Sequence, residues 1–118
     1  MATTRGPGRL RLRVIFDPDV VLGPGKADLL EGIRETGSIS AAGRRMKMSY
    51  KRAWDLVDAL NRYFDQPAVF TSKGGSGGGG ASLTPWGEEL LGLYRRIEAR
   101  SAEAVADEVA QLRRHLHG

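Results

Sequence analysis

Residues 37–61 read GSISAAGRRMKMSYKRAWDLVDALN, and this stretch decides the fold. Two short helical patterns meet in it across a turn at residues 46–48. Ser38 and Ser49 stand where each helix needs a side-chain oxygen to cap its first unpaired amides. The stretch therefore predicts a helix-turn-helix.

The same stretch is strongly basic. No acidic residue occurs between Glu35 and Asp55. Four arginines, at positions 5, 9, 11 and 13, precede it, so the net charge of +4 conceals basic segments and a net acidic remainder. Such asymmetry is expected of a protein that binds nucleic acid, double-stranded DNA included, and about equally of a solvated basic face with no partner. The cations of the motif are Arg44, Arg45, Lys47, Lys51 and Arg52.

Composition excludes several classes of protein. At 118 residues the chain suits one small domain plus an extension, and its 41% hydrophobic and 27% charged residues are typical of globular proteins. The absence of cysteine excludes disulfides, thiolate zinc sites and cysteine nucleophiles. No apolar run approaches the roughly 18 residues that span a bilayer, and no signal segment is present. We therefore expect no membrane partner and a cytoplasmic location.

Ahead of the motif, the sequence predicts an arm, a strand and a helix. Residues 1–8 are expected to form a flexible arm. In residues 9–14 arginine alternates with apolar residues, and this period of two predicts a strand with one buried face. A helical pattern follows, and Gly37 is placed to end it. The residues of the strand expected to face the core are Leu10, Leu12 and Val14.

The second helix of the motif, over about residues 49–64, is the candidate recognition helix. Tyr50 and Lys51 lie outside its apolar stripe, on a surface suited to base edges and phosphates. Trp54 has two interpretations of nearly equal weight, a residue that contacts DNA and a partly buried core aromatic. The residues expected to face inward are Ala53, Val57 and Leu60.

A glycine-rich run at residues 74–80 separates two segments that favour β-structure, residues 68–73 and 81–84. A phosphate-binding loop would need a helix directly after the glycines, and an interdomain linker would need a finished domain before them. Neither condition is met. The run is therefore interpreted as the tip of a hairpin, a wing, whose bare backbone can lie along a sugar-phosphate strand beside Lys73.

Thr84 as N-cap and Pro85 at the first helical position predict a last helix that runs to the end of the chain. If continuous, it is about 30 residues and about 45 Å long, more than a domain of this size covers. We expect it to pair with the same helix of a second subunit, the alternative being a frayed tail beyond about Ala102. The residues expected to form the dimer seam are Leu90, Tyr94, Ile97, Val105, Val109 and Leu112.

Together these elements make a winged helix-turn-helix, mainly α with a small β-sheet. Over about residues 9–97 the chain resembles the amino-terminal DNA-binding domain of ModE-type molybdate-responsive transcriptional regulators, which is itself related to the LysR-type domain. The resemblance rests on GPGKADLLEGI before the motif, on the motif itself, on GGSGGGGASLT at the wing and on TPWGEELLGLY in the last helix.

The resemblance implies a homodimer that inserts residues 49–55 into the major groove of DNA and lays the wing along the neighbouring backbone. Ser76 stands where the family usually has a basic residue, which weakens the expected wing contact. Full-length members continue into a molybdate-binding domain that these 118 residues do not contain. The chain therefore resembles a short form whose effector the motif does not identify. The residues expected to contact DNA are Ser38, Arg44, Arg45, Lys47, Ser49, Tyr50, Lys51, Arg52, Trp54, Lys73, Gly74, Gly75 and Ser76.

We thus expect an arm (1–8), a winged helix-turn-helix domain (9–84) and a C-terminal dimerisation helix (85–118). The expected function is sequence-specific DNA binding by a homodimeric regulator without enzymatic activity, and the resemblance implies molybdenum-related gene control. The alternative is a protein-interaction module that works through its last helix, with the basic motif vestigial. A nucleotide-binding enzyme is disfavoured because no catalytic triad or cofactor fingerprint occurs. His115 and His117 would lack further metal ligands, so neither a metal nor a cofactor is expected.

Overall fold

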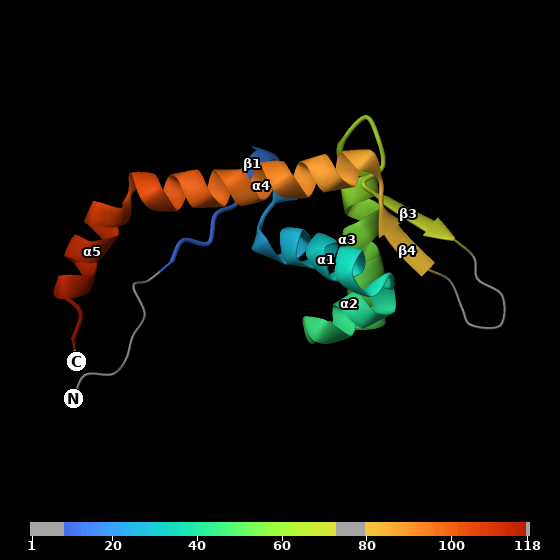
Figure 1. Ribbon diagram of the computed structural model, residues 1–118, viewed down its shortest axis with the longest axis horizontal. Coiled ribbons are helices and arrows are strands. Elements are labelled where there is room, and N and C mark those ends of the chain that lie inside the picture. Colours follow the sequence, from blue (N-terminus) through green and yellow to red (C-terminus); the bar gives the residue numbers. More distant parts are fainter. Residues whose placement is uncertain (1–8, 73–79, 118) are drawn as a thin grey trace.

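The computed structural model describes residues 9–72 and 80–117 of the chain. The described part is mainly helical, with two separate antiparallel two-stranded sheets rather than the single small sheet expected (Figure 1). None of its helices combines the length and the apolarity needed to cross a membrane. In chain order the elements are β1 (Val14–Asp17), β2 (Val20–Leu22), α1 (Pro24–Thr36), α2 (Ile39–Arg45), α3 (Tyr50–Tyr63), β3 (Val69–Ser72), β4 (Gly80–Leu83), α4 (Pro85–Ala104) and α5 (Ala106–Arg114).

The core lies between the first three helices, and α4 crosses over this group (Figure 1). Each helix contributes one apolar stripe, which is the arrangement that periodic burial requires. The largest fully buried side chains come from α1, α3 and α4, and they are Leu29, Leu30, Ile33, Val57, Leu60, Leu91 and Tyr94.

The helix ends follow the local signals of the sequence. Gly37 adopts the left-handed conformation, with φ of 73°, and its N–H donates to the carbonyl of Ile33, which ends α1 as predicted. The hydroxyls of Ser38, Ser49 and Thr84 each accept a hydrogen bond from an amide in the first turn of α2, α3 and α4. The three predicted N-caps are therefore confirmed.

The predicted strand at residues 9–14 is wrong in its bounds, because β1 begins only at Val14. Residues 9–13, the described residues before β1, form no ladder. The predicted alternation of burial nevertheless persists, with Leu10 and Leu12 half-buried between exposed arginines. This segment is tied to α4, since the hydroxyl of Tyr94 donates to the carbonyl oxygen of Leu12 at 2.6 Å. Burial also raises the pKa of Tyr94, because it disfavours the phenolate.

The predicted single C-terminal helix is two helices. The chain leaves helical geometry at Val105, with φ of −113° and ψ of 14°, and α5 bends away from α4 (Figure 1). Among the described residues no side chain after Tyr94 is fully buried. Tertiary packing therefore does not hold the helix straight over its second half.

Two of the predicted dimer-seam residues belong to the core of the chain itself. Leu90 is 3% exposed and Tyr94 is 0% exposed, which leaves neither side chain a surface for a second subunit. Their assignment to the seam is corrected. Ile97 and Leu112 are exposed, whereas Val105 and Val109 are half-buried.

Position 87 has no room for a side chain, because a Cβ atom on Gly87 would lie 2.1 Å from the carbonyl oxygen of Ala68. We expect Gly87→Ala to lower the free energy of unfolding by roughly 3 kcal/mol, since α4 would have to move away from the start of the hairpin. Gly92, on the same helix, is the matched control, because apart from its own helical backbone and chain neighbours no described part of the chain lies within 4 Å of its Cβ position. Gly92→Ala should stabilise the chain by about 0.5–1 kcal/mol. Urea denaturation of both variants measures the difference, and equal stabilities would contradict the packing described.

Candidate nucleic-acid interface

The turn between α2 and α3 is short and closely hydrogen-bonded. The N–H of Met48 donates to the carbonyl of Gly43 at 3.0 Å, and Lys47 takes a positive φ of 58° to make the turn. The helices approach closely, since a Cβ atom on Gly43 would lie 3.0 Å from Cβ of Ala53. The predicted helix-turn-helix is therefore present, with α2 crossing α3 through small residues.

The two faces of α3 are divided as the sequence predicts. Its inner face carries Ala53, Val57 and Leu60, which are at most 1% exposed. At its start Tyr50 is 62% exposed, and the neighbouring Lys51 and Arg52 are exposed as well. The first turn of α3 thus presents an aromatic ring and two cations to the outside.

Trp54 lies between these faces. It is half-buried, it packs against the hydrophobic core, and its ring meets that of Tyr50 edge-on with centroids 6.2 Å apart. The core interpretation therefore accounts for most of this side chain. Its contact with Tyr50 also orients the exposed ring at the start of α3.

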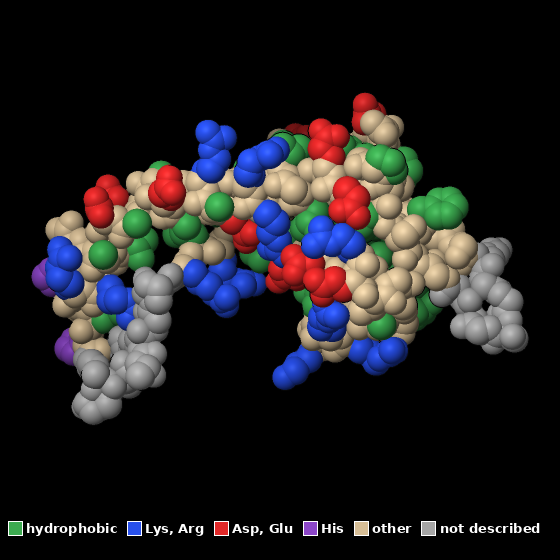
Figure 2. Space-filling model, viewed as in Figure 1, with side chains coloured by type: hydrophobic (Ala, Val, Ile, Leu, Met, Phe, Trp, Pro, Cys, Tyr) green, Lys and Arg blue, Asp and Glu red, His purple; other side chains and the backbone are tan. Residues whose placement is uncertain are grey.

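The cations of the motif differ in their partners. Arg45 pairs with Glu35, and Lys51 pairs with Asp55 at 3.0 Å. Within the described residues Arg44, Lys47 and Arg52 make no ion pair. Exposed pairs contribute about 0–1 kcal/mol, so either pair can open when a stronger anion arrives. Lys and Arg side chains project from the lower edge of the molecule, over α2 (Figure 2).

The hairpin of β3 and β4 is fastened to the helix-turn-helix by Asn61, near the end of α3. The Oδ1 atom of Asn61 accepts from the amides of Ala68 at 2.8 Å and Val69 at 2.9 Å, and its Nδ2 donates to the carbonyl of Val69 at 3.2 Å. On the other strand the amide of Ala81 donates to the carbonyl of Gly37 at 2.9 Å. Sequence reasoning gave Asn61 no role, although an amide side chain just before a predicted strand is a usable signal.

The predicted hairpin pairing is confirmed, with Val69 opposite Leu83 and Ser72 opposite Gly80. The connection between the strands, residues 73–79, lies outside the described residues. The predicted DNA contacts of the wing fall on this connection, and the structure does not describe them. These contacts are Lys73, Gly74, Gly75 and Ser76.

Arg95 fixes α4 against α1. Its guanidinium donates to the carboxylates of Asp28, Glu31 and Glu98, each at 2.9 Å. Partial burial alone would lower the pKa of Arg95, but these hydrogen bonds outweigh it and raise the pKa above its ordinary value. The cluster holds the two helices together and neutralises Asp28 and Glu31, two carboxylates of α1 that would otherwise repel a polyanion.

The described residues contain no group of three or more His, Asp or Glu side chains placed to hold a metal ion. Their distinguishing features are a helix-turn-helix, a basic and aromatic first turn on its second helix, and an attached two-stranded hairpin. Fold and site together define a protein of the helix-turn-helix class.

Comparison with known proteins gives the family. No protein-family model matches the chain. The Molybdenum-pterin-binding protein MopB of Rhodobacter capsulatus is 47% identical over 85 residues, which cover 72% of this chain and 32% of that protein. The Transcriptional regulator ModE of Haemophilus influenzae is 39% identical over 93 residues, or 79% of this chain and 36% of the relative. The DNA-binding transcriptional dual regulator ModE of Escherichia coli is 36% identical over 90 residues, which cover 74% of this chain and 34% of that protein.

The chain is thus related to the ModE-type transcriptional regulators over most of its length, which confirms the resemblance predicted from the sequence. It spans about a third of the length of these curated relatives.

Proposed function

We propose that this chain is a sequence-specific DNA-binding transcriptional regulator. The observation that carries the proposal is the orientation of α3. Its inner face is fixed in the core, which leaves Tyr50, Lys51 and Arg52 exposed around its first turn. A helix that presents such residues fits the major groove, where side chains reach base edges and thymine methyl groups.

The β3–β4 hairpin acts as the wing in this proposal. Asn61 fixes its base to α3, and the glycine-rich connection lies against the sugar-phosphate backbone beside the groove. The names of the ModE relatives support a role in transcription, and the name of MopB supports a link to molybdenum. The genes controlled are then molybdenum-related, and no catalytic step is involved.

The regulator is proposed to act as a homodimer through α4 and α5. Leu93, Ile97 and Leu112 are 37%, 39% and 71% exposed, so these two helices carry apolar side chains that the described part of the chain leaves largely uncovered. Joining two such surfaces removes them from water and places two α3 helices on one DNA duplex.

We expect the double variant Tyr50→Ala with Lys51→Ala to lose preference for a cognate site, by about 10- to 100-fold for each base contact removed. The matched control is Arg96→Ala with Arg100→Ala, two exposed cations of α4. Titrations of a selected site and of random DNA, followed by fluorescence anisotropy, give the selectivity ratio. If the Tyr50/Lys51 variant kept the wild-type ratio, α3 would not be the reading element.

For the homodimer we expect wild-type protein to sediment at twice the chain mass and the variant Ile97→Glu with Leu112→Glu to sediment at the chain mass. A charge in the seam would have to be desolvated, which opposes association. The control Ile15→Glu replaces an equally apolar side chain, 63% exposed on β1, and should leave the dimer intact. A monomeric wild type, or a Glu variant that remains dimeric, would contradict this interface.

A further inference from the structure

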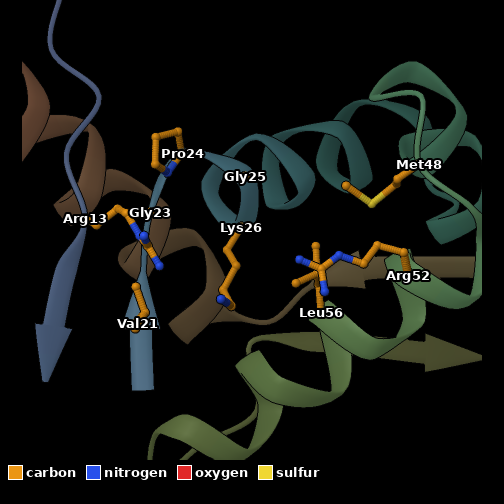
Figure 3. A pocket seen from close by; sticks show the side chains of 9 residues that line it. All are labelled: Arg13, Val21, Gly23, Pro24, Gly25, Lys26, Met48, Arg52 and Leu56. Carbon is orange, nitrogen blue, oxygen red and sulfur yellow. The ribbon is translucent and has the colours of Figure 1, made fainter. Parts of the chain in front are cut away.

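We propose that the start of α1 forms a binding pocket for one phosphate group of the DNA backbone. The pocket is an open depression of about 190 Å³ between the β1–β2 hairpin, the first turn of α1 and the first half of α3 (Figure 3). This inference rests on the proposed function, and it adds a contact that lies outside the helix-turn-helix and the wing.

Three cations from different parts of the chain converge on this depression. Arg13 comes from the segment before β1, Lys26 from the first turn of α1 and Arg52 from the first turn of α3. None of the described residues that line the pocket is acidic. Three like charges around one concavity repel one another, and a bound anion relieves that repulsion.

The positions of the cations are supported by packing. A Cβ atom on Gly23 would lie 3.1 Å from Cγ of Arg13, so the stem of this arginine runs directly over the backbone. The ammonium group of Lys26 lies 5.5 Å from the centre of the Tyr63 ring. Figure 3 shows the guanidinium of Arg52 extending from α3 toward the side of the pocket where Lys26 lies.

The backbone adds to the positive potential. No side chain caps the first turn of α1, and that turn contains no acidic residue. Apart from its own helical backbone and chain neighbours, no described part of the chain lies within 4 Å of a Cβ position on Gly25, so a ligand can approach the main chain there. The partial positive charge of a helix start therefore faces the same depression as the three cations.

The location identifies the anion as DNA phosphate. Arg52 follows Tyr50 and Lys51 in the same helical turn, so the pocket is continuous with the surface proposed to enter the major groove. Phosphates flank that groove on both sides, and contacts to them fix register without reading sequence. Arg52 therefore contacts the phosphate backbone of the DNA, while Tyr50 and Lys51 contact the bases.

The test measures the salt dependence of DNA binding. The variant Arg13→Gln with Lys26→Gln removes two charges and keeps the first two methylene groups of each side chain, and Arg11→Gln is the control from the same exposed segment. If one phosphate is lost, the slope of log affinity against log salt falls by about 0.9. Affinity near 0.1 M salt then falls on the order of tenfold, with the ratio of cognate to random DNA unchanged. Arg52→Gln should give the same loss and add little to the double variant, because all three cations hold one group.

Several results would overturn the pocket. The pocket would be contradicted if the double variant had the same salt slope as Arg11→Gln. If the wild-type protein still bound DNA selectively, the proposed function would be unaffected by that result. If the wild-type protein showed no selective DNA binding, both the proposed function and the phosphate pocket would be contradicted. Thermal melts in sodium phosphate and sodium chloride of equal ionic strength test a free anion. Stabilisation of wild type by phosphate, absent in the double variant and accompanied by an unchanged DNA salt slope, would make the pocket a site for free oxyanions instead. Lys26→Gln alone, on the helix surface, provides a second variant if the double variant melts early.

Discussion

Contacts between very small residues hold α3 in place, and the rest of the surface depends on them. A Cβ atom on Gly43 would lie 3.0 Å from Cβ of Ala53, and one on Gly32 would lie 3.0 Å from Cβ of Ala42. Packing at this distance fixes the mutual arrangement of α1, α2 and α3, because larger side chains at these contacts would force the helices apart. With Ala53 pressed against α2, the opposite side of α3 must face outward, and that side carries Lys51, while Tyr50 at the start of the helix stays exposed beside it.

A second junction, at the backbone of Ala68, positions the hairpin and α4. The amide of Ala68 donates to Asn61, its carbonyl accepts from the amide of Thr84 at 3.0 Å, and Gly87 packs against the same carbonyl. One residue thus links the end of α3, the start of β3 and the first turn of α4. The hairpin therefore keeps a defined angle to α3, and α4 leaves the core in one direction.

Features that depend on neighbouring residues, such as helix ends and the buried face of a helix, could be predicted from the sequence. The caps at Ser38 and Ser49 and the stop at Gly37 depend on neighbouring residues, so the helix-turn-helix and the inner face of α3 followed from pattern alone. Periodicity identifies an apolar face without saying what covers it. Tyr94 was therefore placed in a dimer seam, whereas the segment around Leu12 lies against it within the chain. The break in the last helix, the role of Asn61 and the meeting of the three cations at the α1 pocket all depend on residues distant in sequence.

The central claim is that α3 reads DNA from the major groove, and methylation interference tests it most directly. Dimethyl sulfate modifies guanine at N7 in the major groove and adenine at N3 in the minor groove, so one experiment compares both grooves. Methylation of guanine N7 should block binding of wild-type protein in two clusters about 34 Å apart, one for each half-site, or at a multiple of that spacing. Interference confined to adenine N3, or none in a complex that remains sequence-selective, would contradict the claim.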